Sequence, residues 1–223
     1  MKEGNNKQFW QRVAKVYAPF MGSAAPLYTA ICERIRPQLT REMDVLELAC
    51  GTGQLSYPLS RFVRLWEATD FSEAMITEAK RQNRSARLRF SVQDATALPY
   101  GAETFDAVVI SNALHIMPDP EQVMREIDRV LKPGGLLFAP TFVHGESMGF
   151  RLRTRLMGLA GFRTYHKWST EEFLAFVARH SFEVVERDVL GSRIAPLCYV
   201  AARKGSPEWS AQKAKGEKGG SPS

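Results

Sequence analysis

The sequence has few cysteines and no long apolar run, and these two absences exclude whole classes of protein. Three cysteines occur in 223 residues, and an odd number without regular spacing argues against a secreted fold held by disulfides. Apolar runs such as 107–110 and 136–142 are far shorter than the roughly 20 residues that cross a bilayer. The first residues also lack the pattern of a secretory signal. We therefore expect a cytoplasmic protein without a transmembrane helix.

A broad nucleic-acid surface is not indicated either, although the formal net charge is +6. Five basic side chains and no acidic one lie between residues 151 and 167, and four lysines lie between 204 and 223. The rest of the chain is nearly neutral, so the excess charge is confined to two segments. We expect no nucleic-acid partner.

What is present fits one α/β domain with additions, because 223 residues with 44% hydrophobic content can bury a single core. Short apolar runs predict five strands, at 45–49, 65–69, 88–92, 105–110 and 136–142. Helical patterns separate them, and such alternation is typical of a parallel sheet covered on both faces. Two further helices, at about 9–20 and after Pro26, are expected before the first strand.

Capping residues mark where the later helices begin. Ser72 and Asp119 are expected to start helices that end near Gln82 and before 133–135, and Ser169 with Glu172 forms a capping box. The last two strand-like runs, 182–190 and 197–203, are separated by about six residues. Because a parallel pair needs a crossover of roughly a dozen residues, they are predicted to pair antiparallel.

The most informative stretch is the strand and turn from Val45 to Gly53, which ends in Gly51-Thr52-Gly53. Small residues let a ligand approach the backbone, and a helix N-terminus offers unpaired N–H groups. Asp70 closes the next strand, where a carboxylate can accept hydrogen bonds from ribose hydroxyls. These features alone leave several nucleotide cofactors open, and also a plain tight turn with Asp70 as a cap.

Further blocks make a resemblance specific. They are Asp70-Phe71-Ser72 with Met75, Asp94-Ala95 before Leu98-Pro99, Phe105-Asp106, and Val130 to Gly135. In this order, over about 45–142, they resemble the successive motifs of class I S-adenosylmethionine-dependent methyltransferases, and most of all the ubiquinone and menaquinone methyltransferase-like group. The resemblance implies a Rossmann-like, doubly wound α/β sheet of seven strands, mostly parallel with a reversed final hairpin strand.

The same resemblance implies the cofactor, S-adenosyl-L-methionine, and the residues that bind it. Glu47, Ala49, Gly51 and Gly53 would line its methionine side, and Asp70 would bind the ribose. The remaining contacts would come from Phe71 and Met75 around adenine, Asp94 and Ala95 at its edge, and Ser111 through its backbone. Phe71 and Met75 as plain core, and Asp94 as a turn residue, stay open as alternatives.

Two positions depart from the family pattern. The family usually has glycine where Ala49 stands, although alanine is small enough for binding to survive. The usual Tyr-Asp pair near the N-terminus is Tyr17-Ala18 here, so Tyr17 is a candidate contact to the cofactor carboxylate or the acceptor, and no aspartate role is transferred.

Subclass markers are mostly missing. Ser111-Asn112-Ala113-Leu114 stands where nucleic-acid amino-methylating enzymes carry Asn-Pro-Pro-Tyr, and no Pro-Cys follows that strand. The four histidines lack pairwise metal-ligand spacing, so no metal is expected. His115, directly after the fourth strand, is the candidate general base, and a structural imidazole is the alternative.

We therefore expect a methyltransferase that acts on an O, N, S or C nucleophile of a small acceptor, such as a quinol, thiol, amine or phenol. An NAD-dependent oxidoreductase or epimerase is the first alternative, disfavoured because Gly51-Thr52-Gly53 continues to Ser56 and not to a third glycine. A non-catalytic S-adenosylmethionine-binding protein is the second, disfavoured by the intact motifs. The oligomeric state is not indicated.

The expected layout is cap helices at 1–40, the methyltransferase domain at 41–204 and a disordered tail at 205–223. Within the domain, the connection 143–168 is predicted to form a helical lid over the acceptor site. Its basic residues are Arg151, Arg153, Arg155, Arg163 and Lys167. They either face solvent or attract an anionic acceptor or lipid surface, which would give peripheral membrane contact.

Overall fold

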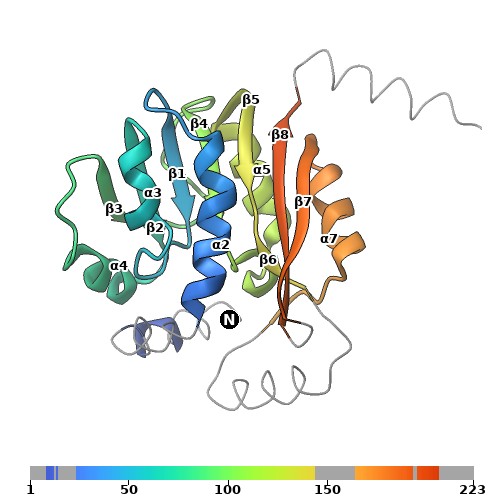
Figure 1. Cartoon of the computed structure of the whole chain (residues 1–223), viewed down its shortest axis with the longest axis horizontal. Coiled ribbons are helices and arrows are strands. Elements are labelled where there is room, and N and C mark those ends of the chain that lie inside the picture. Colours follow the sequence, from blue (N-terminus) through green and yellow to red (C-terminus); the bar gives the residue numbers. More distant parts are fainter. Residues whose placement is uncertain (1–8, 13, 15–23, 144–163, 193–194, 206–223) are drawn as a thin grey trace, which may run out of the picture.

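The computed structural model describes residues 9–12, 14, 24–143, 164–192 and 195–205. Eight strands in this part form one mixed sheet in the order β3-β2-β1-β4-β5-β8-β6, and β7 also pairs with β8 (Figure 1). The strands are β1 (Asp44–Leu48), β2 (Leu65–Asp70), β3 (Leu88–Val92), β4 (Phe105–Ile110), β5 (Leu131–Phe138), β6 (Thr141–Phe142), β7 (Phe182–Ser192) and β8 (Ala195–Lys204).

The sheet has the predicted direction changes. β1 to β5 pair in parallel, whereas β8 is antiparallel to β5, β6 and β7. The Rossmann-like fold with a reversed final hairpin is thus confirmed. Seven strands match the predicted set, and the eighth, β6, has two residues.

The apolar run 136–142 differs from the single strand predicted for it. It divides into the end of β5 and the short β6, because Pro140 has no N–H to donate to a ladder. β5 also begins earlier, at Leu131, which pairs with Phe105 before a shift in register. Gly134, at φ 74°, provides the left-handed backbone that this irregular start requires.

Helices cover both faces of the sheet. Figure 1 shows α2 in front of the strands and α5 behind them. The helices are α2 (Ala25–Ile35), α3 (Ser56–Leu59), α4 (Glu73–Lys80), α5 (Pro120–Val130) and α7 (Thr170–Ala178), with short 3-10 segments η2 (Arg36–Gln38), η3 (Ser60–Phe62) and η4 (Leu114–Ile116). Residues 9–12 and 14 are also helical.

The alternation of side chains along the strands produces two cores. In β4, Val108 and Ile110 pack with α5 and α7, whereas Ala107 and Val109 pack with α2, α3 and α4. Both sets are fully buried. A strand with both faces buried reads as a continuous apolar run, which is why the sequence pattern located β4 without error.

The predicted helix starts are confirmed. Ser72 accepts a hydrogen bond from the Met75 N–H at 3.4 Å, and Asp119 accepts one from the Gln122 N–H at 2.9 Å. The capping box of Ser169 with Glu172 is complete.

Most of the predicted lid, 143–168, lies outside the described residues, as do the predicted tail from residue 206 and Tyr17. Both described ends of the lid segment form backbone hydrogen bonds to the rest of the domain. The Val143 N–H donates to the Pro196 carbonyl at 3.1 Å, and the Tyr165 and His166 N–H groups both donate to the His115 carbonyl at 3.0 Å. Among the described residues, no helix has the length and apolar character needed to cross a membrane.

Candidate functional site

A cavity opens at the carboxyl ends of β1, β2 and β4, next to the point where the strand order reverses. Ligands of open α/β sheets bind at such switch points. Predicted site residues that line it are Glu47, Ala49, Gly51, Asp70, Phe71, Met75, Asp94, Ala95 and Ser111. The fold therefore brings together residues spread over more than sixty positions of the sequence.

The turn after β1 forms the floor of the cavity. Ala49 and Gly51 both have a left-handed backbone, at φ 53° and φ 56°. This conformation costs an alanine about 1–2 kcal/mol, which explains why the family usually has glycine at position 49. The backbone of the turn is nevertheless in the form that glycine would adopt.

Gly53 does not line the cavity. A Cβ atom at this position would stand 2.8 Å from the Tyr57 ring, and the backbone has φ 91°. Glycine is thus favoured by packing beneath the turn, and the predicted place of Gly53 beside the cofactor stays a prediction.

Asp70 ties the two turns of the site together. Its Oδ2 accepts a hydrogen bond from the Gly51 N–H at 2.9 Å, and its Oδ1 accepts one from the Ser72 N–H at 2.8 Å. Burial raises the pKa of this carboxyl, and the two hydrogen bonds oppose that rise. Each oxygen keeps a further lone pair, so a fixed acceptor pair is available to a ligand.

Glu47 is a second buried carboxylate, with 2% of its surface exposed. Its Oε2 accepts hydrogen bonds from the Ser56 hydroxyl at 2.5 Å and from the Trp66 indole N–H at 2.7 Å. Burial raises the pKa of Glu47 to about 7, against the lowering effect of these two donors, and Asp70 adds to the rise. A carboxyl that titrates near neutral pH is typical of a functional site.

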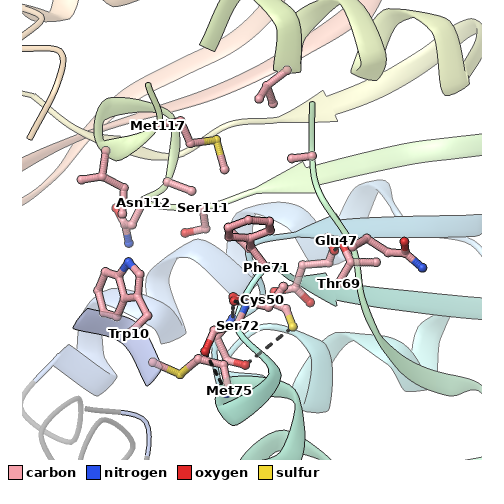
Figure 2. A pocket seen from close by; sticks show the side chains of 18 of the residues that line it. Trp10, Glu47, Cys50, Thr69, Phe71, Ser72, Met75, Ser111, Asn112 and Met117 are labelled. Carbon is pink, nitrogen blue, oxygen red and sulfur yellow. Dashed lines mark hydrogen bonds between the residues drawn. The ribbon is translucent and has the colours of Figure 1, made fainter. Parts of the chain in front are cut away.

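Apolar and amphipathic groups form the walls. Phe71 keeps 43% of its surface exposed, whereas Met75 beside it is buried, and Figure 2 shows the Phe71 ring projecting into the cavity. Asp94 accepts hydrogen bonds from the backbone N–H and hydroxyl of Thr96, at 2.8 and 2.7 Å. Asp94 is therefore a turn residue and a lining residue at once.

The loop after β4 contributes two buried polar atoms to the cavity. The Ser111 hydroxyl and the Asn112 Oδ1 are buried and have no hydrogen-bond partner among the described residues, and both residues line the cavity. Because such groups are costly to leave unpaired, they indicate a polar ligand.

Several lining residues were not anticipated from the sequence. They are Trp10, Tyr28, Gln54, Thr69, Asn112, Ile116, Met117 and Pro118. Trp10 gave no separate signal in the sequence, because it stands three residues before Val13 and seven before Tyr17, next to the apolar stripe predicted for this helix. Figure 2 shows Trp10 and Asn112 on the same side of the cavity.

His115, the candidate base, is 8% exposed and does not line the cavity. Its ring lies edge-on to Phe142, with ring centroids 6.3 Å apart. Its neighbours Ala113 and Ile116 do line the cavity. The structure thus favours the structural alternative for His115, and its role as a base stays a prediction.

Comparison with known proteins decides the family. The model of the family described as "Methyltransferase domain" matches residues 46–139. A demethylmenaquinone methyltransferase from Shouchella clausii is 34% identical over 163 residues, which cover 63% of this chain and 69% of that protein. This chain belongs to the family of class I S-adenosylmethionine-dependent methyltransferases. It falls in the ubiquinone and menaquinone methyltransferase-like group.

Other relatives match a smaller share of this chain. A demethylmenaquinone methyltransferase from Renibacterium salmoninarum is 40% identical over 107 residues, covering 48% of this chain and 44% of that protein. The chain thus spans less than half the length of that relative. Among solved structures, a methyltransferase in complex with the Haloferax volcanii Trm112 activator has a TM-score of 0.76 at 17% identity, over 88% of this chain and 97% of that one. At this identity the likeness shows the fold.

The cavity of the methyltransferase fits the family's cofactor, S-adenosylmethionine. It offers a rigid carboxylate at the end of β2, an exposed aromatic ring beside it, and a turn of small residues. The side chains of Ser111 and Asn112, which lack a hydrogen-bond partner among the described residues, are further polar groups of its lining. Membership of this family replaces the alternative of an NAD-dependent oxidoreductase or epimerase.

Proposed function

We propose that this chain transfers the methyl group of S-adenosylmethionine to a small, neutral aromatic acceptor, such as a quinol or phenol. The observation that carries the proposal is that one cavity joins the cofactor motifs to residues from outside them, chiefly Trp10, Asn112 and Met117. The motif residues would hold the cofactor. The others would form the side that the acceptor approaches.

The cofactor contacts follow from the chemistry of each group. Asp70 would accept hydrogen bonds from the ribose hydroxyls, and Phe71 would stack on the adenine with Met75 behind it. Asp94 and Ala95 would read the adenine edge. Glu47 would face the α-ammonium of the methionine part, since a buried carboxylate needs a positive partner. The turn at Ala49 and Gly51, and the backbone of Ser111, would complete the methionine side, with Tyr17 as a further candidate.

The charge of the lining supports a cationic ligand. Glu47, Asp70 and Asp94 are its acidic residues, and no lysine or arginine is found in the described lining. When bound, S-adenosylmethionine supplies an electrophilic methyl group on a positively charged sulfur. Carboxylates held in a site of low dielectric favour that charge.

The residues on the acceptor side of the cavity fit an apolar acceptor whose hydroxyl group ionises readily. Trp10, Tyr28 and Met117 give it aromatic and thioether surface. No histidine or lysine is found in the described lining, and a phenol-type hydroxyl, with a pKa of about 10, loses its proton more easily than an aliphatic alcohol. An acceptor lone pair would attack the methyl carbon in line while the sulfur–carbon bond breaks and the sulfur keeps the electron pair. Holding the two groups about 3–3.5 Å apart and excluding water supplies most of the acceleration.

The predicted lid, the basic residues at 151–167 and the tail at 205–223 stay predictions, as does a cytoplasmic location. One contact supports the lid. The Tyr165 and His166 N–H groups bind the His115 carbonyl, which joins the end of the segment to the loop that carries Asn112 and Met117.

The test is product formation. The purified chain is incubated with S-adenosylmethionine and a panel of quinols, phenols, thiols and amines, and methylated products are detected by mass spectrometry. We expect turnover with aromatic hydroxyl or quinol acceptors, and calorimetric binding of S-adenosylmethionine but not of NAD. Cofactor binding without any methylated product across the panel would favour the non-catalytic alternative and contradict the proposal.

His115→Gln tests the base separately. A general base contributes about 10²–10⁴-fold to rate, so that role predicts a loss of this size at unchanged cofactor affinity. Full turnover across pH 6 to 9 would leave His115 with its packing role against Phe142.

A further inference from the structure

Glu47, the carboxylate proposed to bind the cofactor, accepts hydrogen bonds from two side chains that lie outside the family motifs. Trp66 lies on β2 and pairs with Val45 of β1, two residues before Glu47. Paired residues and residues two apart share a face of the sheet, so the indole and the carboxylate point to the same side. Their distance, 2.7 Å from Nε1 to Oε2, is that of a strong hydrogen bond to a charged acceptor.

The second donor comes from the helix that follows the turn after β1. Ser56 begins α3, and its hydroxyl donates to the same Oε2 atom at 2.5 Å. Both donors are fully buried, so no water competes with them. Oε2 thus accepts two hydrogen bonds, and no hydrogen bond joins Oε1 to another of the described residues. Glu47 also lines the cavity.

We propose that Trp66 and Ser56 are positioning residues, which hold one oxygen of Glu47 so that its charged form is ready for the α-ammonium of the cofactor. This inference rests on the proposed function, because it concerns the same site. Neither residue lines the cavity, so both act through Glu47.

The electrostatic surroundings make the two donors necessary. The titratable groups that face Glu47 are Asp70 from the end of β2, Cys50 from the turn and Cys32 from α2. None of them supplies positive charge. Burial and the Asp70 charge disfavour ionisation, while the Ser56 and Trp66 hydrogen bonds favour it. Removing one donor therefore shifts the ionisation of Glu47 to higher pH.

This shift in the pKa of Glu47 distinguishes a positioning role of Trp66 from a role in packing alone. Only ionised Glu47 attracts the ammonium, so cofactor affinity falls as pH drops through the pKa of about 7. In Trp66→Phe that fall begins about one pH unit higher. The variant then binds about tenfold more weakly than wild type at pH 6, yet within about twofold at pH 8.5. A loss of packing alone would weaken binding by one factor at every pH.

The experiment is calorimetry with S-adenosylhomocysteine, which keeps the ammonium, from pH 5.5 to 8.5. Wild type, Trp66→Phe and Ser56→Ala are compared at each pH, so titration of the ligand's own ammonium affects all alike. The matched controls are Tyr57→Phe, which removes a hydroxyl bond to the Ala79 carbonyl, and Ser60→Ala, which removes another buried hydroxyl. Neither control residue contacts Glu47, so their profiles should follow wild type.

A second readout needs no cofactor. In ¹⁵N-labelled protein the indole N–H resonance of Trp66, assigned by its loss in Trp66→Phe, should titrate near pH 7 and stay constant in Glu47→Gln. An unshifted pH profile in Trp66→Phe, a pH-independent loss, or an indole resonance that does not titrate would each overturn the inference. A wild type that fails to bind the ligand at any pH would instead overturn the proposed function, and the indole titration would then report on the Glu47 contact by itself.

Discussion

Asp70 accepts a hydrogen bond from the backbone N–H of Gly51 at 2.9 Å, so the turns that follow two neighbouring strands are locked to each other. The same carboxylate holds the Ser72 N–H, which fixes the start of α4. A single side chain therefore sets the shape of the site and offers acceptors to a ligand. Replacing Asp70 should therefore affect both the shape of the site and the binding of a ligand.

We expect Asp70→Ala to lose cofactor affinity by about 2–4 kcal/mol, because two ribose hydroxyls and two backbone N–H groups lose a charged acceptor. Calorimetry with S-adenosylhomocysteine on the folded variant measures the loss. Asp70→Asn keeps the size of the side chain but only one acceptor oxygen, so its affinity should fall between those of wild type and Asp70→Ala. Unchanged affinity in Asp70→Ala would remove this residue from the ribose site.

Phe71→Ala should weaken cofactor binding by about 0.5–1.5 kcal/mol, the range of an aromatic stacking contact. The folded state should change little in stability, because the ring is 43% exposed. Val92→Ala is the matched control, since Val92 is 39% exposed and does not line the cavity. Thermal unfolding and calorimetry together test both statements, and equal affinities for the two variants would count against stacking.

Glu47→Gln should change how stability depends on pH. The pKa of Glu47 in the folded protein, about 7, lies above its ordinary value of 4.5. In wild type, Glu47 therefore gives its full contribution to folding stability below pH 4.5, and this contribution is lost as pH rises through 7. Relative to wild type, the variant should gain about 2–3 kcal/mol in unfolding free energy between pH 5 and pH 8. Urea unfolding at the two pH values measures this, and a constant difference would mean that Glu47 does not titrate there.

Gly53→Ala should destabilise the fold by about 1–3 kcal/mol, since the backbone at φ 91° is strained for any other residue. The added Cβ would also stand 2.8 Å from the Tyr57 ring. Gly101→Ala is the control, because its Cβ would meet the Thr104 hydroxyl at an ordinary 3.5 Å. Denaturant midpoints compare the two, and equal stability would show that the turn relaxes freely.

Much of the fold followed from the sequence because β1 and β4 are buried on both faces and α4, α5 and α7 begin with side-chain caps. The runs at 88–92 and 105–110 were located with their ends, and Ser72, Asp119 and Ser169 marked three helix starts. The division at Pro140 was missed because apolar content, on which the prediction relied, does not reveal a broken ladder.

The site was predictable where a residue's role depends on its own segment. Asp70, Phe71 and Met75 follow from the end of one strand and the start of one helix, and all three line the cavity. Trp10 and Met117 reach it only through tertiary packing, which no local pattern encodes. The Trp66 contact to Glu47 likewise depends on the register of β1 with β2, which is a property of the folded sheet.

The anchoring of the segment between Val143 and Tyr165 has a consequence for how such enzymes diversify. One end is tied to Pro196 and the other to the His115 carbonyl, so both ends of the intervening chain are fixed by contacts of the folded domain. For a flexible connection with fixed ends, doubling its length costs only about 0.6 kcal/mol of closure entropy. At that rate, a change in the number of residues between the two anchors adds little closure entropy to the cost of folding. Under the proposed function, this connection can change in length next to the loop of Asn112 and Met117 while both anchors and the strands that carry the proposed cofactor residues keep their places.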